Sequence, residues 1–148
     1  MFMEAENLEC ERRQIHVICE KGRATTQITL DDDHNLAEYK PDILKIVEEK
    51  GQVRMEEIKV EPDVVRLRGA LHFEVLYRCA AEDGGFARLS GDLPFQEHVR
   101  MEGAQEYDSV YADPQIEDLS MTLINSRKLS IRSLLTIRLE LREPCVHD

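Results

Sequence analysis

Apolar and polar residues alternate with a period of two over most of the chain, a pattern typical of β-strands that bury one face. The clearest run covers residues 65–79, where the odd-numbered residues are apolar or Gly and most even-numbered residues are polar. A second run covers residues 129–141, in which almost every odd-numbered residue is Leu or Ile. We therefore expect two long strands, each with one face in a core.

Shorter runs lie before and between these two. Residues 53–55 place their apolar side chains on one parity and residues 58–60 on the other, which predicts a β-bulge near Glu56-Glu57. Residues 86–95 form a less regular run that Gly and Pro interrupt, which favours an edge strand. Residues 109–123 are also extended in character.

One segment has a different period. Pro41-Asp42 resembles the first turn of a helix, and Gly51 resembles a stop signal. Between them the apolar residues are spaced by one, three and four positions, as on one face of a helix: Ile43, Leu44, Ile46 and Val47. The pattern predicts a short helix over about residues 41–50 that covers a sheet.

The N-terminal part is less regular. Residues 1–21 begin with residues of high helix propensity and continue with strand-like alternation from Ile15. Lys21-Gly22 is interpreted as a turn that joins this strand to a second one at residues 24–30 in a hairpin. Asp31-Asp32-Asp33-His34-Asn35 is interpreted as a polar loop.

The connections between expected strands are short turns, so the strands should pair antiparallel, and long strands with one apolar face need a second layer. The expected fold is mainly β: a two-layer antiparallel β-sandwich with one short covering helix. The expected organisation is an N-terminal extension (1–21), a β-sandwich domain (22–142) and a C-terminal tail (143–148).

Composition narrows the possible functions. The 148 residues include 19 basic and 30 acidic residues, and the net charge of −11 disfavours nucleic acid and anionic membranes as partners. We find no secretory signal and no apolar run of the length that crosses a bilayer. The four cysteines form no C-x-x-C pair, which predicts a reducing, cytoplasmic setting.

Candidate chemistry is sparse. Asp31-Asp32-Asp33 with His34 lacks the alternating ligands of a calcium loop, and the histidines and cysteines lack zinc-site spacing. There is no G-x-S-x-G elbow, and Gly84-Gly85 lacks the lysine and helix of a phosphate loop. We therefore expect no enzyme activity, no metal and no cofactor.

Two stretches carry a resemblance to a known family: residues 39–47 (YKPDILKIV) and residues 123–129 (LINSRKL). They resemble the SPOCS domain of endospore-forming bacteria, which occurs in SipL-type spore coat morphogenetic proteins. Residues 69–77, Leu93-Pro94-Phe95 and residues 116–119 fit the same domain, so the resemblance covers roughly residues 25–141. Such proteins often carry several copies of the domain and a peptidoglycan-binding LysM domain, whereas this sequence has one copy.

The resemblance implies a non-catalytic interaction or scaffolding module in spore coat or envelope assembly, with spore morphogenetic or coat proteins as partners. It also implies a location in the mother cell or at the forespore surface. The candidate interaction residues are those of its motifs: Lys40, Pro41, Asp42, Asn125, Ser126, Arg127 and Lys128. The motif at 125–128 either shapes a turn, with Arg127 and Lys128 paired to carboxylates, or contacts a partner directly.

Two alternatives remain open. A concave sheet face can bind a small ligand or a glycan, although only 5% of the residues are aromatic. The edge strand expected at residues 86–95 can instead pair with a second copy, which would make the protein a self-associating structural unit.

Overall fold

The computed structural model describes residues 16–82 and 84–146, and all of its regular elements are strands. Six strands follow one another along the chain: β1 (His16–Asn35), β2 (Ile43–Glu61), β3 (Val64–Cys79), β4 (Phe86–Arg100), β5 (Ser109–Asn125) and β6 (Lys128–Val146). They form two antiparallel sheets of three strands, with the orders β1-β6-β5 and β2-β3-β4.

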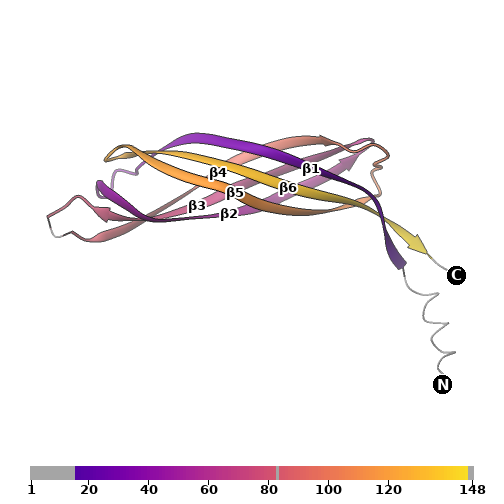
Figure 1. Ribbon diagram of the computed structural model, residues 1–148, viewed down its shortest axis with the longest axis horizontal. Helices are drawn as coiled ribbons and strands as arrows, with labels where there is room; N and C mark the ends of the chain where they lie inside the picture. The colour runs from indigo at the N-terminus through magenta and orange to yellow at the C-terminus, as the bar shows by residue number, and fades with distance from the viewer. Residues whose placement is uncertain (1–15, 83, 147–148) are drawn as a thin grey trace, which may run out of the picture.

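The two sheets make an elongated sandwich in which all strands run along the long axis (Figure 1). Strands of 15 to 20 residues span about 50–65 Å when extended. β6 and β3 are the central strands, while the edges of opposite sheets approach each other, β2 against β5 and β1 against β4. The predicted two-layer antiparallel sandwich is confirmed.

The core lies between the two central strands. The odd-numbered residues of β3, from Val65 to Tyr77, are all buried, Gly69 among them. The odd-numbered residues of β6, from Leu129 to Leu141, are buried opposite them. Burying one such apolar side chain contributes about 1.5–3 kcal/mol. The alternation that predicted two long strands therefore identified the two halves of the core.

The predicted helix at residues 41–50 is wrong, because these residues form the first half of β2. Leu44 and Val47 lie at register shifts, so each is an extra residue that has no partner in β3. The inward-facing residues Ile43 and Ile46 are consequently three positions apart, as on a helix. Two bulges occupied by apolar residues thus reproduced a helical pattern within a strand.

The third bulge of β2 lies between Met55 and Glu57, which confirms the bulge predicted from the change of parity. Gly51, expected to end a helix, lies in the middle of the strand. A Cβ at this position would lie 3.0 Å from Leu119 Cδ2 and 3.2 Å from Ile116 Cδ1. Gly51 therefore allows β5 to pack closely against β2 where the two sheets meet.

The predicted turn at Lys21-Gly22 is also wrong, since β1 runs through it as one strand. The register with β6 shifts between Glu20 and Gly22, so Lys21 is a bulge residue. Its Nζ lies 2.8 Å from Oδ2 of Asp108, a side chain that is fully buried. A bulge thus directs Lys21 onto the β4–β5 connection, and the same Lys-Gly pair does not reverse the chain.

The acidic run at residues 31–35 is the end of β1 and is not the predicted loop. Asp31 lies 3.3 Å from Arg132 and Asp33 lies 3.7 Å from Lys128, both on the neighbouring strand β6. Cross-strand pairs of opposite charge favour strand pairing. Basic residues of β6 therefore make an extended conformation favourable for this acidic segment.

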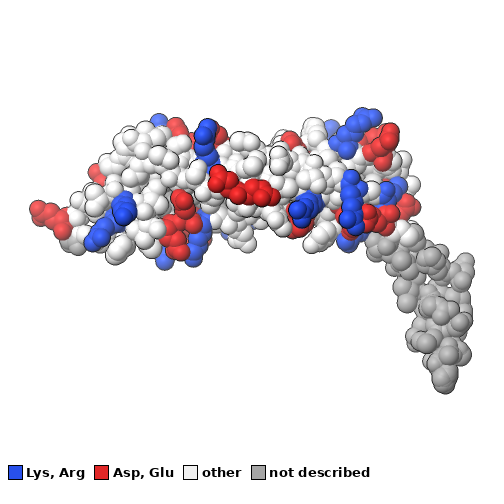
Figure 2. Space-filling model, in the orientation of Figure 1, with Lys and Arg blue, Asp and Glu red and all other residues white. Residues whose placement is uncertain are grey.

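The edge strands carry features that oppose aggregation. Pro94 lies in β4 and Pro114 in β5, and both strands are edges, which confirms the edge strand expected at residues 86–95. Figure 2 shows acidic and basic side chains interspersed over the face it presents, with uncharged areas between them. This pattern agrees with the cross-strand ion pairs found along the sheets.

Residues 1–15, for which a helix or frayed end was expected, lie outside the described residues. No helix in the described part of the chain is long and apolar enough to cross a membrane. Cys79 is a buried free thiol, whereas Cys19 is disulfide-bonded.

Gly69 offers a direct test of the packing. A Cβ there would lie 2.4 Å from the Arg54 carbonyl oxygen and 2.9 Å from Phe95 Cζ. Gly69→Ala should therefore lower the free energy of unfolding by about 1–3 kcal/mol in urea titrations. Gly22→Ala is the matched control, because a Cβ there meets nothing within 4 Å, and its effect should stay within about 0.5 kcal/mol. Equal effects of the two substitutions would contradict this packing.

Candidate functional site

Two segments that are far apart in the sequence meet at one end of the sandwich. They are the β1–β2 connection, residues 36–42, which passes from one sheet to the other, and the β5–β6 turn, residues 125–128. Arg127 joins them: its Nη1 donates to the Lys40 carbonyl oxygen at 3.0 Å and to Asp42 Oδ1 at 2.6 Å. Its Nη2 donates to the Ala37 carbonyl oxygen at 2.9 Å. One guanidinium thus holds the connection at three points.

The turn is shaped by its own side chains. Asn125 Oδ1 accepts a hydrogen bond from the Arg127 backbone N–H at 2.8 Å, as asparagine commonly does in tight turns. Ser126 Oγ donates weakly to Asp42 Oδ2 at 3.4 Å. The Ser126 carbonyl oxygen accepts from Ile43 N at 2.8 Å. The turn and the start of β2 are therefore bonded through both backbone and side chains.

Pro41 is anchored from the core side. The Tyr77 hydroxyl donates to the Pro41 carbonyl oxygen at 2.8 Å, and the Tyr77 ring is fully buried in β3. Burial raises the pKa of Tyr77 above its ordinary value. The phenol consequently stays protonated and remains a donor at neutral pH.

The two lysines of the motifs point to different strands. Lys40 Nζ donates to the Arg88 carbonyl oxygen of β4 at 2.6 Å, and Lys128 Nζ lies 3.7 Å from Asp33 Oδ2 in β1. All seven motif residues predicted from the sequence thus lie around one connection. Arg127 and Lys128 pair with carboxylates, as the turn-shaping interpretation expects. A direct partner contact by these residues stays a prediction.

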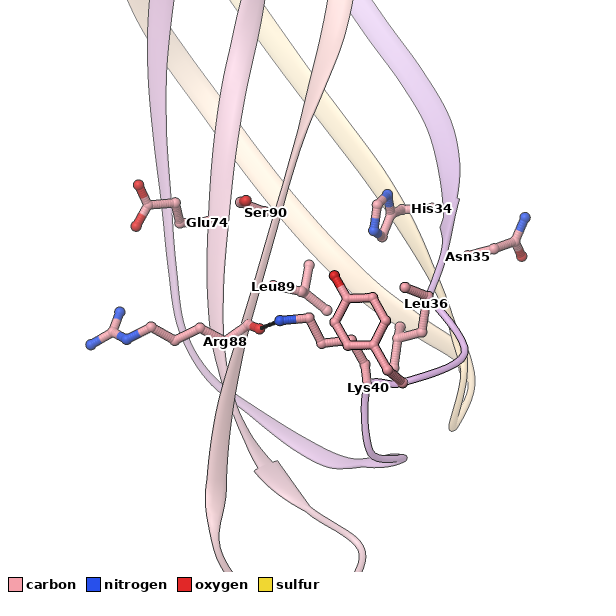
Figure 3. A pocket seen from close by; sticks show the side chains of 10 residues that line it. His34, Asn35, Leu36, Lys40, Glu74, Arg88, Leu89 and Ser90 are labelled. Carbon is pink, nitrogen blue, oxygen red and sulfur yellow. Dashed lines mark hydrogen bonds between the residues drawn. The ribbon is translucent and has the colours of Figure 1, made fainter.

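A groove of about 400 Å³ opens beside this connection (Figure 3). The end of β1 and the connection form one side, and β4 with Glu74 of β3 forms the other. Leu36 and Leu89, both buried, supply its apolar part, and Lys40 reaches across it to the Arg88 carbonyl group. The volume falls within the range of ligand-binding clefts.

His34 lies where the groove meets the core. Its ring contacts Phe73 edge-on, with centroids 5.4 Å apart and planes at 85°. A Cβ at Gly91 would approach Phe73 Cζ to 2.6 Å and His34 Cε1 to 3.3 Å, so this glycine makes room for both rings. Burial lowers the pKa of His34, and the nearby Asp32 carboxylate opposes this only in part. A neutral imidazole therefore fills the gap between the sheets.

Large apolar side chains are exposed at the same end. We call Leu44, Val47, Phe86 and Ile124 the apolar end patch; they are between 50% and 60% exposed. Leu44 and Ile124 each lie within two residues of the Ile43–Ser126 hydrogen bond, and Phe86 pairs with Arg78, whose other partner is Lys45. These four exposed apolar side chains are the candidates for contact with a partner protein.

No metal-binding arrangement accompanies this end. Within residues 16–82 and 84–146, no three His, Cys, Asp or Glu side chains are grouped so that they could hold an ion. Asp31 and Asp33, considered above as candidate ligands, are paired with cations of β6. The chemistry that this site offers is hydrogen bonding, charge and apolar contact.

The protein is thus a two-sheet β-sandwich in which the seven motif residues lie around the β1–β2 connection. A family model described as "SipL, SPOCS domain" matches residues 42–124. The chain therefore belongs to the SipL, SPOCS domain family, as the resemblance indicated. No curated protein and no solved structure matched the chain.

The matched segment is shorter than the folded unit. Residues 42–124 comprise β2, β3, β4 and nearly all of β5. β6, which pairs with both β1 and β5, lies outside the match, although its side chains form half of the core. The first sheet exists only when these flanking strands are present.

Sequence reasoning did not reveal the groove or the apolar end patch. His34, Arg88 and Ser90 lie in the groove because β1 and β4 approach each other across the two sheets, a contact between distant segments. Leu44 and Val47 were interpreted as the buried face of a helix, whereas bulges expose them. The sequence did indicate this exposure, because consecutive residues of a strand face opposite sides. In Ile43-Leu44 and Ile46-Val47, only one residue of each pair can face the core.

Arg127 should be important for stability. Arg127→Lys keeps the charge but cannot donate to three acceptors from one plane, so we expect a loss of about 1–3 kcal/mol in the free energy of unfolding. Backbone amides of residues 36–42 should also exchange faster with solvent. Arg138→Lys, on the exposed face of β6, is the control and should change neither measurement. Unchanged amide exchange in Arg127→Lys would show that the guanidinium does not hold the connection.

The burial of His34 predicts an acid-sensitive stability. Its pKa is lowered in the folded state, so the unfolded chain binds a proton first as the pH falls. The stabilisation that neutral His34 provides is fully present above the ordinary histidine pKa of about 6.5. It is lost as the pH falls through the folded-state pKa of His34. Urea midpoints between pH 7.5 and 5 should fall less steeply in His34→Gln than in the native chain. A slope in His34→Gln equal to or steeper than that of the native chain would refute the assignment.

Proposed function

We propose that this chain is a non-catalytic protein-interaction module that takes part in assembling the coat or envelope of bacterial endospores. Membership of the SipL, SPOCS domain family supports the sporulation context. We place the protein in the mother cell or at the forespore surface, with coat or spore morphogenetic proteins as partners.

The apolar end patch is the observation that carries the interaction role. Its four side chains are at least half exposed, and two of them, Leu44 and Ile124, lie beside the hydrogen bond that joins the start of β2 to the β5–β6 turn. A preformed surface loses little conformational entropy when a partner binds. Exposed apolar anchors on a rigid support are typical of interaction surfaces.

The bulges of β2 give a physical reason for this surface. The first two bulges each add a residue that has no partner in β3, and these two residues are Leu44 and Val47. Lys45 and Glu48 beside them are exposed and polar. The strand thus presents apolar side chains to solvent and keeps Ile43 and Ile46 in or against the core.

Capture from sporulating cells tests this proposal. A tagged chain cross-linked in such cells should enrich coat or spore morphogenetic proteins, and Leu44→Glu with Val47→Glu should remove most of that enrichment. Tyr111→Glu is the matched control, because Tyr111 is 55% exposed in the first half of β5, away from the patch. Circular dichroism should show that all three proteins fold. Enrichment that is absent, or that the double variant retains in full, would contradict the proposal.

A further inference from the structure

We propose that the groove beside the β1–β2 connection binds an extended acidic segment of a partner protein, which adds as a strand to the free edge of β4 at Phe86–Ser90. This inference rests on the proposed interaction function and assigns it a binding mode. The partner is recognised by an extended backbone with acidic side chains.

The hydrogen-bonding pattern of β4 supplies the template. Cys79 N donates to the Gly85 carbonyl oxygen at 2.7 Å, and the register continues from Arg78 opposite Phe86. Hydrogen-bonded and non-bonded pairs alternate in an antiparallel ladder. The odd-numbered residues of β4 therefore bond to β3, and the even-numbered residues direct their N–H and C=O groups away from it.

The outward groups between Phe86 and Asp92 face the groove and its approaches. β4 is an edge strand, and β1 lies near it without forming a ladder. The Arg88 carbonyl oxygen accepts its hydrogen bond from a side chain, Lys40 Nζ (Figure 3). A flexible lysine at this point can be replaced by the backbone N–H of an incoming strand. Strand addition to a free edge is a common mode of peptide recognition.

The template has a defined end. Pro94 is even-numbered, so its missing N–H falls on the free edge and costs the ladder with β3 nothing. Beyond it, Glu97 accepts a hydrogen bond from Thr26 of β1 at 3.1 Å, which ties the two edges together. The open part of the edge is therefore the part beside the groove.

Charge indicates the class of partner. The chain has a net charge of −11, and about half of the Lys and Arg residues in its described part lie in ion pairs, for example Arg66 with Glu61 and Arg68 with Glu56. Among the described cations that lie in no ion pair, Lys40, Arg78 and Arg88 are those beside the groove and the start of β4. Lys40 borders the groove, Arg88 is exposed on β4, and Arg78 stacks on Phe86 at 5.6 Å. These cations are available for carboxylates that flank an added strand.

Amide exchange of the full chain tests this binding mode with a defined probe, an octapeptide of alternating Val and Glu. The peptide should slow exchange at Phe86, Arg88 and Ser90 and leave Ala87 and Leu89 unchanged, because the latter already bond to β3. The Val and Lys counterpart should give at least about tenfold weaker binding.

Two substitutions separate the backbone and charge contributions. Ser90→Pro removes one outward N–H, as Pro94 already does further along, and should abolish the protection. Gln96→Pro, of the same parity but beyond the groove, should leave it intact. Arg88→Glu should weaken the acidic peptide about tenfold, whereas Arg138→Glu should not.

Other outcomes overturn the proposal. Protection without the alternation, or equal binding of the acidic and basic peptides, would refute strand addition or the acidic class. Self-association of the chain that Ser90→Pro abolishes would show that a second copy is the occupant. If Ser90→Pro still captures coat proteins from cells while the peptide fails, this inference falls and the interaction function stands.

Discussion

Face-to-face packing of β3 against β6 is the interaction on which the rest of the structure depends. Each is the central strand of its sheet, and each contributes a row of buried residues. The other four strands are edges that each pair with only one of these two. Removing apolar surface from either row would therefore affect both sheets at once. Leu→Ala or Ile→Ala in such a row costs about 2–5 kcal/mol.

Four of the six strands are edges, and the free backbone groups of an edge can pair with another chain unless they are covered. At the β2–β5 seam, Leu119 and Ile116 pack over Gly51. At the β1–β4 seam, His34 and Phe73 pack at Gly91, and Thr26 bonds to Glu97. The groove opens at the end of this second seam, next to the connection that Arg127 holds. Core packing, edge closure and the proposed binding surface are thus parts of one arrangement.

The sequence predicted what depends on local periodicity. The parity of Val65 to Cys79 and of Leu129 to Leu141 identified the central strands, and the parity change at Glu56-Glu57 identified a bulge. The sequence-based prediction was wrong where β-bulges produce the residue pattern of a helix or of a turn. Leu44 and Val47 imitated a helix between Pro41 and Gly51, and Lys21-Gly22 imitated a turn. The motif residues were found, but their meeting was not, because Arg127 reaches Asp42 only through the crossover between sheets.

The central claim is that both sheets fold as one cooperative unit around β3 and β6. Native-state hydrogen exchange of the full chain at increasing urea concentration tests it most directly. Amides of β3 that bond to β2 or β4 and amides of β6 that bond to β1 or β5 should exchange with one common free energy, equal to that of global unfolding. Separate limiting free energies for the β1-β6-β5 and β2-β3-β4 sheets would contradict the account.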